Sequence, residues 1–258
     1  MTAHIIARGI GLQVPHFLQN ERLKQSLYST LATAVFTRSR RELRTLIHDV
    51  SFEIHEGERL AIMGRNGAGK TTLLRILTSA FQPTQGELDI QGSRQALLNL
   101  GLGFNSEATV RENVFLRAIA MGMRTAQIQD LIGPILEFAE LGDVLNHRLI
   151  TLSSGQRMRL GFAISTAIQH DIILLDEWLG AGDAAFVEKA RKRMTDRVDG
   201  SKIVVLASHN FPLLRKVCNK GLVIDHGGLV YFGDLATAIA EYKKIYQSDP
   251  MYIARTSD

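Results

Sequence analysis

Residues 64–71 read GRNGAGKT and fit the pattern Gly-x-x-x-x-Gly-Lys-Thr in full. The glycines let the backbone wrap closely around an anion, with its N–H groups pointing inward. An apolar stretch typical of a buried strand, RLAIM (59–63), precedes the loop, and a helical stretch, TTLLRILTSAF (71–81), follows it. Pattern and context favour a phosphate-binding loop between a strand and a helix over a chance glycine-rich turn.

The side chains of this loop indicate what it would hold. Lys70 would place its charge on the β- and γ-phosphates of a nucleotide, and the Thr71 hydroxyl would ligate Mg²⁺. Backbone N–H groups of the loop and of the first helical turn would complete the contacts. The predicted nucleotide-binding residues are Gly64, Arg65, Asn66, Gly67, Ala68, Gly69, Lys70, Thr71 and Thr72.

Polar residues also end two apolar stretches later in the chain. Asp176 and Glu177 end DIILLDE (171–177), and Ser208 and His209 end IVVLASH. Alone, such a run is more often only a strand end, and a lone histidine there is more often structural. Ligand sites of open α/β sheets, however, lie at the carboxyl ends of strands. Beside a phosphate loop, Asp176 would hold Mg²⁺ through water, Glu177 would deprotonate or orient the attacking water, and His209 would reach the γ-phosphate.

A second stretch suited to an anion is TLSSGQRMRL (151–160). A Ser-Ser-Gly turn here precedes a predicted helix, so hydroxyls, backbone N–H groups and the positive end of a helix dipole converge. The loop at 64–71 and the Asp-Glu strand already form half of a nucleotide site. The second turn is therefore redundant in a monomer, unless it serves the nucleotide of another chain.

The bulk composition is that of a globular protein with one large domain divided into lobes. The 258 residues are 45% apolar and 22% charged. No stretch approaches the roughly 18 apolar residues of a membrane span, and the N-terminus lacks the apolar core of a secretory signal. The single cysteine, Cys218, excludes an internal disulfide framework, fits a reducing compartment and is expected to be a packed thiol.

Strands and helices alternate along the later part of the chain, which predicts an α/β fold with a mainly parallel sheet. We expect the helical segment 109–148 to break at Gly122, at Gly133-Pro134 and at Gly142. Strands are predicted at 4–10, 48–58, 59–63, 84–92, 171–177, 203–209 and 222–233.

Taken together, these motifs resemble the ATPase subunits of ABC transporters over nearly the whole chain. The order and spacing of DVSFEIHEGE, GRNGAGKTTLLRIL, TLSSGQRMRL, DIILLDE, ASHN and LVIDHGGLVYFGD agree with that family. The resemblance implies a single domain with a P-loop NTPase (RecA-like) core, an N-terminal antiparallel β subdomain and a helical subdomain. The implied boundaries are about 1–103 and 156–240 for the core with its β subdomain, 18–45 for a basic helical insertion, 104–155 for the helical subdomain and 241–258 for a short C-terminal tail.

The resemblance also implies roles for the residues already singled out, with ATP and Mg²⁺ as cofactors. Lys70 and Thr71 correspond to the P-loop pair, with Lys70 also contributing to catalysis. Asp176 corresponds to the metal-linked carboxylate, Glu177 to the catalytic general base and His209 to the switch histidine.

The stretch Leu152–Gln156 is similar to the family's signature motif, usually Leu-Ser-Gly-Gly-Gln. That motif contacts the γ-phosphate of the ATP held by the P-loop of the other subunit, which implies an ATP-sandwich dimer of two copies of this chain. Asp183, in GAGDAAF, matches the loop that links the two sites across the dimer. The signature residues expected to act in trans are Ser153, Ser154, Gly155 and Gln156.

Three positions depart from the family's pattern. Ser154 stands where glycine is usual, which keeps the N–H but adds a hydroxyl and narrows the allowed backbone angles. The glutamine expected before the helical lobe is missing from NLGLGFNSEATVREN, where Asn105 is the nearest amide and the remaining candidate for the metal site. The position of the aromatic residue that stacks on adenine aligns with Val14; either His16 or Phe17 substitutes for it, or these are simply strand-end residues.

Within the family, three features look like the exporters of bacterial surface polysaccharides such as capsule, O-antigen and teichoic acid. They are LLNLGLGFNSEATVRENV without its glutamine, the EWLGAGDAAF run and the long insertion before HDVSFEI. The resemblance implies a motor subunit on the cytoplasmic face of the bacterial inner membrane. Its partners would be two copies of a separate transmembrane permease and a lipid-linked polysaccharide, and no nucleic acid. Some such exporters carry a further carbohydrate-binding domain, which we expect to be absent because the chain stops about 25 residues beyond the last predicted strand.

Two further functions stay open on these motifs. A soluble ABC ATPase outside transport, such as an iron–sulfur assembly factor, or the ATPase of another ABC exporter would carry the same motifs. A nucleotide switch that barely hydrolyses ATP is disfavoured by the intact phosphate loop, Asp176, Glu177 and His209.

The net charge of +4 is located in the insertion. Residues 21–44 hold six arginine and lysine residues against two glutamates, so the rest of the chain sums to zero. Leucines recur there every four residues, which predicts a helix with an apolar stripe. Arg38, Arg40 and Arg41 would meet anionic lipid headgroups or a lipid-linked pyrophosphate, or the helix is simply solvated and packed on the core.

Overall fold

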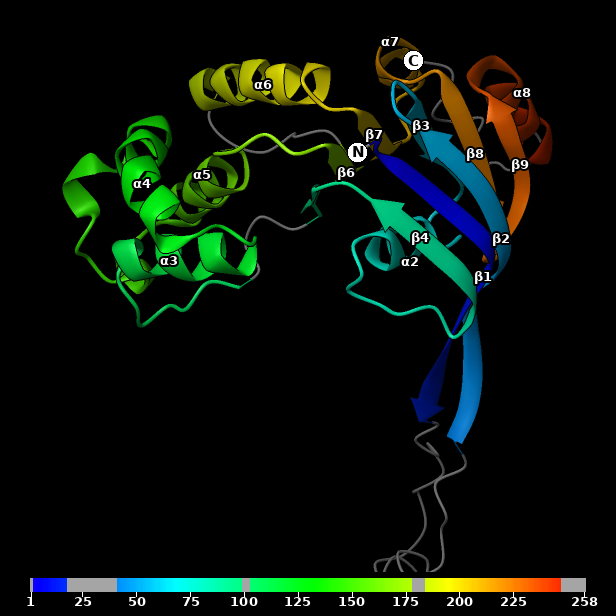
Figure 1. Ribbon diagram of the computed structural model, residues 1–258, viewed down its shortest axis with the longest axis horizontal. Coiled ribbons are helices and arrows are strands. Elements are labelled where there is room, and N and C mark those ends of the chain that lie inside the picture. The colour runs from blue at the N-terminus through cyan, green and yellow to red at the C-terminus, as the bar shows by residue number, and fades with distance from the viewer. Residues whose placement is uncertain (1, 18–40, 99–102, 178–183, 247–258) are drawn as a thin grey trace, which may run out of the picture.

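The computed structural model describes residues 2–17, 41–98, 103–177 and 184–246 (Figure 1). Within these ranges nine strands form one sheet in the order β4-β1-β2-β9-β8-β3-β7-β6-β5. The strands are β1 (His4–Phe17), β2 (Arg41–His55), β3 (Arg59–Met63), β4 (Gln85–Gln91), β5 (Arg94–Leu97), β6 (Ile172–Asp176), β7 (Ile203–Ala207), β8 (Lys220–Asp225) and β9 (Gly228–Asp234). The helices are α2 (Lys70–Leu77), α3 (Val110–Ala120), α4 (Thr125–Ala139), α5 (Ser154–Ser165), α6 (Ala184–Asp199), α7 (Phe211–Val217) and α8 (Leu235–Tyr246), with 3₁₀ turns at Gly142–Val144 and Leu149–Thr151.

The sheet combines a parallel part with an antiparallel part. β8, β3, β7, β6 and β5 pair in parallel, whereas β1 pairs antiparallel with both β2 and β4. β9 returns antiparallel along β8. The predicted α/β fold, with a mainly parallel core sheet and an N-terminal antiparallel subdomain, is confirmed.

Strand β3 shows why the central strands read as continuous apolar runs. Successive side chains of a strand point to opposite faces. Leu60 and Ile62 therefore join the core cluster that includes α2 and the β subdomain, while Ala61 and Met63 join the cluster on the helical side. Both faces are covered, so β3 carries the phosphate loop on a fully buried support.

Helices α3, α4 and α5 form a lobe beside the sheet (Figure 1). Three aromatic side chains, Phe138, Phe162 and Phe186, pack there with ring centroids 5.7–6.0 Å apart. The predicted boundary at 155/156 falls inside α5, and the predicted start of the tail at 241 falls inside α8. Both helices bury apolar side chains and so continue across the predicted limits.

Several element predictions were wrong. α4 runs through Gly133 and Pro134, because both residues lie on its exposed side while Ile132, Ile135 and Leu136 keep the opposite face buried. A glycine before proline also lacks the Cβ that would clash with the proline ring. The breaks at Gly122 and Gly142 are present.

Three other elements differ from their predictions. The stretch 222–233 is a hairpin of β8 and β9, turned by His226 and Gly227, both at positive φ. β5 was not predicted, and α2 ends at Leu77 rather than at residue 81.

The predicted insertion is bounded by a ladder between β1 and β2. Their pairing continues out to Phe17↔Arg41, so residues 41–45 belong to a strand and not to a helix. The chain segments that enter and leave the insertion thus satisfy each other's backbone hydrogen bonds. The predicted helix and its basic residues up to Arg40 lie outside the described residues, and their role stays a prediction.

The composition also led to predictions about the single cysteine and about membrane-spanning segments. Cys218 is buried in the core, which confirms a packed thiol, and this burial raises its pKa to about 12. Among the described residues, no helix is both long and apolar enough to cross a bilayer.

Candidate functional site

The loop between β3 and α2 depends on glycine at two points. Gly69 has φ +112°, and a Cβ there would lie 2.8 Å from Ile47 Cδ1. A Cβ on Gly64 would lie 2.4 Å from the backbone oxygen of Ile224. Any side chain at these positions would therefore reshape the loop.

Lys70 is held inside this loop. Its ammonium group donates to the backbone oxygens of Gly64 at 2.7 Å and Arg65 at 2.9 Å. Burial lowers the pKa of Lys70, and the neighbouring Asp176 and Glu177 only partly oppose this. An anion entering the loop would add to the negative charge that stabilises the half-buried ammonium.

Thr71 and Asp176 meet although 105 positions separate them. The Thr71 hydroxyl donates to Asp176 Oδ2 at 2.6 Å. One hydroxyl and one carboxylate beside a phosphate loop are the hard oxygen ligands that Mg²⁺ takes, together with water and substrate phosphates. The residues present thus fit the predicted metal.

Glu177 and His209 reach the same pocket because β6 and β7 are neighbours. The Glu177 N–H donates to the Ala207 oxygen at 2.8 Å, and Ser208 and His209 follow directly. Glu177 has φ +66°, a strained conformation for a residue with a side chain and one that concentrates at functional sites. A pocket of about 500 Å³ results, lined by Asn66, Gly67, Gly69, Lys70, Thr71, Thr72, Asp176, Glu177 and His209.

The start of α5 is built differently. Ser153 caps the helix: its Oγ accepts from the Gln156 N–H at 3.2 Å, and Gln156 Oε1 accepts from the Ser153 N–H at 2.9 Å. Ser153, Ser154 and Gly155 are exposed, and the residues found around the nucleotide pocket include none from this turn. The structure therefore does not bring the predicted signature residues to the chain's own phosphate loop.

The structure does not bring Asn105 to the pocket either. Its side-chain oxygen accepts from the Glu107 N–H at 3.0 Å, and its backbone bonds to Asn113. Asn105 instead lines a separate groove along α3, which contradicts its placement at the metal site. A local turn satisfies this amide, which is the usual use of an asparagine in such a loop.

The remaining predicted positions are only partly described. Val14 packs on the core cluster of the β subdomain, and His16 and Phe17 are the last two residues of β1, as the strand-end alternative predicts. The side chains of His16 and Phe17, and all of Asp183, lie outside the described part of the chain.

Sequence reasoning missed the residues that brace the loop from outside. The Tyr246 hydroxyl, on α8, donates to Asp225 Oδ1 at 2.9 Å, and the Arg65 guanidinium lies 5.7 Å from the centre of the Tyr246 ring. The Gly227 N–H also donates to the Ala68 oxygen at 2.9 Å. No local signal connects positions so far apart in the sequence.

A glycine loop at a helix start, a lysine inside it and a carboxylate at the end of a neighbouring parallel strand define the class of P-loop nucleotide-binding proteins. The family model for ABC transporters matches residues 47–180. The O-antigen export system ATP-binding protein RfbE of Yersinia enterocolitica is 42% identical over 72% of this chain and 78% of that protein. RfbB of Klebsiella pneumoniae, named for the same export system, is 35% identical over 77% of this chain and 80% of its own length.

Other relatives are longer. The teichoic acids export ATP-binding protein TagH of Bacillus cereus is 32% identical, and this chain spans only 42% of it. Among solved structures, an ATP-binding subunit of an ABC transporter superposes with a TM-score of 0.65 at 18% identity, covering 92% of each chain. A dimeric, ADP- and Pi-bound cassette, MJ0796, superposes with a TM-score of 0.63 at 22% identity, covering 90% of this chain and 98% of its own. The chain thus belongs to the ABC transporter family, which confirms the predicted class of ABC ATPase.

Proposed function

We propose that this protein is the ATP-hydrolysing motor subunit of an exporter of lipid-linked bacterial surface polysaccharide. The observation that carries the proposal is the single pocket in which Lys70, Thr71, Asp176, Glu177 and His209 converge from three separate segments of the chain. The order of these segments and the relatives named for O-antigen and teichoic acid export support the cargo class.

Each side chain of the pocket has a distinct part in hydrolysis. Lys70 exchanges its two carbonyl partners for phosphate oxygens, and Thr71 and Asp176 would hold a Mg²⁺ ion, which would neutralise phosphate charge. Glu177 accepts a proton from the attacking water, and His209 donates to the γ-phosphate. Their positions at the ends of the buried strands β3, β6 and β7 keep these groups preorganised.

A second copy of the chain would complete the site. The exposed Ser153-Ser154-Gly155 turn would approach the γ-phosphate bound in the other copy's pocket, with the helix dipole of α5 directed at it. Asp183 would link the two sites. This arrangement explains why one chain carries two helix starts suited to phosphate.

The permease would dock on α3. A groove of about 590 Å³ runs along this helix, and its lining includes Phe115, Leu116 and Ile119. Leu116 is 49% exposed and Ile119 is 54% exposed. Two apolar side chains one helical turn apart thus share an exposed face of α3, which is typical of a surface that binds a partner. A short apolar segment of a transmembrane subunit fits such a groove, and would hold the protein at the inner membrane's cytoplasmic face.

The catalytic part of the proposal is tested by Glu177→Gln, with Glu188→Gln on the exposed side of α6 as the matched control. Loss of the general base is expected to slow ATP hydrolysis by about 100-fold or more while ATP binding persists, so the variant accumulates as an ATP-bound dimer. Phosphate release and light scattering measure the two effects. Normal hydrolysis by Glu177→Gln would overturn the assignment.

The transport part needs a separate readout. We expect the tagged protein to co-purify from membranes with a multi-span subunit, and Leu116→Arg to abolish this while leaving ATP binding intact. A strain carrying Glu177→Gln should lose surface polysaccharide. Recovery with iron–sulfur proteins and without a membrane subunit would instead support the soluble assembly ATPase.

A further inference from the structure

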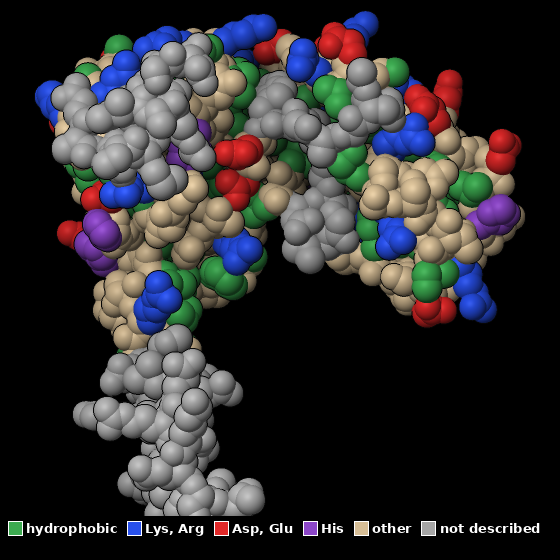
Figure 2. Space-filling model, turned by 180° about the vertical axis from the view of Figure 1, so that it is seen from behind, with side chains coloured by type: hydrophobic (Ala, Val, Ile, Leu, Met, Phe, Trp, Pro, Cys, Tyr) green, Lys and Arg blue, Asp and Glu red, His purple; other side chains and the backbone are tan. Residues whose placement is uncertain are grey.

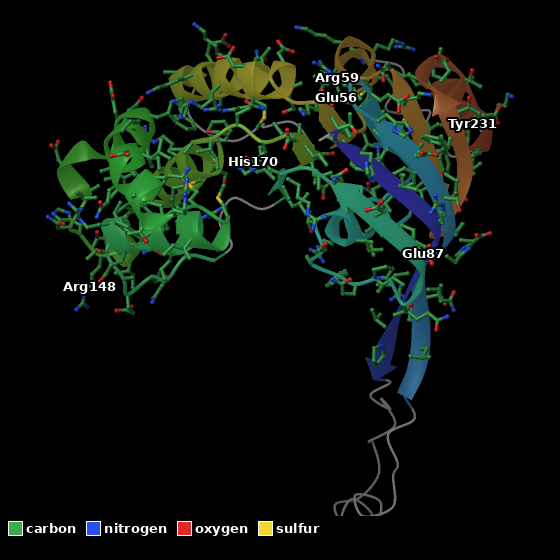
Figure 3. All side chains as sticks on the ribbon, in the orientation of Figure 1. Glu56, Arg59, Glu87, Arg148, His170 and Tyr231 are labelled. Atoms are coloured by element: carbon green, nitrogen blue, oxygen red, sulfur yellow. The ribbon has the colours of Figure 1, made fainter. Side chains whose placement is uncertain are left out.

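A second cavity, of about 200 Å³, lies where the helical lobe meets the sheet. It shares no lining residue with the nucleotide pocket. Arg94, Gln95 and His170 line it from the β5–β6 side, and Arg117 and Ser165 line it from α3 and α5. Figure 3 shows His170 at this junction, between α5 and the sheet. Seen from behind, the two lobes flank a hollow (Figure 2).

Two buried side chains of this cavity lack hydrogen-bond partners. Gln95 and His170 are each only 7% exposed. Within the residues that the structure describes, Gln95 Nε2 and both ring nitrogens of His170 have no partner. Because a buried unpaired donor or acceptor is costly, three such atoms around one cavity indicate that something else occupies it.

The charge around the cavity favours an anion. The Arg117 guanidinium donates to Ser165 Oγ at 3.2 Å and lies 4.6 Å from the centre of the Phe104 ring, and these contacts hold it beside the cavity. Arg94 adds a second guanidinium to the lining. Asp171, which follows His170 in the chain, has other partners: its carboxylate accepts from Ser93 and faces Lys202.

The donors and acceptors around the cavity further restrict which anion fits. A neutral imidazole offers one donor and one acceptor, and the Gln95 amide nitrogen offers donors only. Hydrogen phosphate carries two charges for the two arginines, oxygens for the N–H donors and one O–H for the remaining ring nitrogen. Sulfate matches the charges and the donors but has no O–H to give.

We propose that this inter-lobe cavity is a binding site for a small dianionic oxyanion of the hydrogen phosphate type, distinct from the nucleotide site. Because its lining comes from both sides of the junction, the bound anion bridges the helical lobe to the sheet. Its occupancy couples the placement of α3 and α5 to a solute other than ATP.

The test is a calorimetric titration of inorganic phosphate into the full chain saturated with Mg²⁺ and a non-hydrolysable ATP analogue, at constant ionic strength. The analogue fills the γ-phosphate position, so remaining phosphate binding reports another site. We expect saturable binding of one phosphate per chain, tighter than that of sulfate. Failure of the analogue itself to bind would count against the proposed ATPase and is visible in the preceding titration.

Variants locate the binding. Arg94→Gln, an exposed position, is expected to weaken phosphate binding at least about tenfold, because a charge-assisted contact is lost. His170→Leu should abolish it. Arg111→Gln, on α3 but facing the other groove, is the matched control and should bind as the parent does. Equal affinity in Arg94→Gln and Arg111→Gln, or no saturable binding at all, would overturn the proposal and leave a cavity filled by water.

Discussion

Two helices of this protein begin in ways that suit a phosphate, and they are held by opposite means. The N-cap residue of α2 is Gly69, which provides no side-chain cap, and the preceding loop is shaped by Ile47, Ile224 and Tyr246 from distant parts of the chain. The N-cap residue of α5 is Ser153, which forms a capping box with its neighbour Gln156. The uncapped N-terminus of α2, whose loop is held by distant residues, leaves its N–H groups available to a ligand bound by the same chain. The N-terminus of α5 is capped by its own side chains and needs no ligand to be stable, and its exposure leaves it accessible to the proposed second copy.

The first prediction concerns Gly69, where an added side chain would disturb the loop before α2. Gly69→Ala should lower nucleotide affinity by about 100-fold, because the added Cβ meets Ile47 and displaces preorganised N–H donors. Gly142→Ala, where a Cβ meets nothing within 4 Å, is the control. Fluorescent-nucleotide titration measures affinity, and circular dichroism checks that both variants fold. Equal affinity in the two variants would show that the loop tolerates a side chain.

The second prediction concerns the cap of α5. Ser153→Ala should lower ATP hydrolysis about tenfold while nucleotide affinity stays unchanged, because in the proposed dimer the turn acts on the other copy's nucleotide. Thr109→Ala is a close control, since Thr109 and Glu112 form the same kind of capping box on α3. Both variants should lose about 1 kcal/mol of stability. If hydrolysis falls equally in Ser153→Ala and Thr109→Ala, the α5 cap stabilises its helix and has no separate role in hydrolysis.

The third prediction tests the brace on the α2 loop. Tyr246→Phe removes the hydrogen bond to Asp225 and should lower the free energy of unfolding by about 1–2 kcal/mol. Burial raises the pKa of Tyr246 above the ordinary value of 10.0, so the folded state favours the neutral phenol. The stability that the folded state gains from keeping Tyr246 neutral is complete below about pH 10 and is lost as the pH rises above it.

Denaturant unfolding at two pH values, 8 and 10.5, therefore checks the brace. The stability gap between the parent and Tyr246→Phe should be larger at the lower pH. Tyr231→Phe on β9 is the control. If the stability difference between the parent and Tyr246→Phe does not shrink as the pH rises, Tyr246 does not brace the loop through its neutral phenol.

The smallest effect is expected at Ser154. The residue is helical, the first of α5, and is not among the residues at positive φ, so the structure shows no backbone need for the glycine usual in the family. Ser154→Gly should destabilise the protein by less than about 1 kcal/mol and leave hydrolysis within about twofold. Thermal unfolding and phosphate release measure both quantities. A large gain in hydrolysis would show that the Ser154 hydroxyl tunes the contact to the second copy.

The sequence predicted most of the fold where the pattern was local. Apolar runs located β3, β6 and β7, and the glycine pattern placed a loop between β3 and α2. Prediction failed where neighbours in space decided the outcome. Pro134 did not break α4, because the buried face of that helix outweighs a local preference. Residues 41–45 became a strand because β1 lies beside them.

The same division applies to the site. The motifs by themselves predicted that Lys70, Thr71, Asp176, Glu177 and His209 would meet at one site, because each motif is a short pattern with its own requirement, and these residues line one pocket. Only the tertiary structure decided that Asn105 stays with its turn, that Tyr246 braces Arg65 and that Gln95 and His170 share a cavity with two arginines. The contact of Tyr246 with Arg65 and the cavity shared by Gln95 and His170 join parts of the chain that lie far apart in sequence, and strand order and packing bring them together.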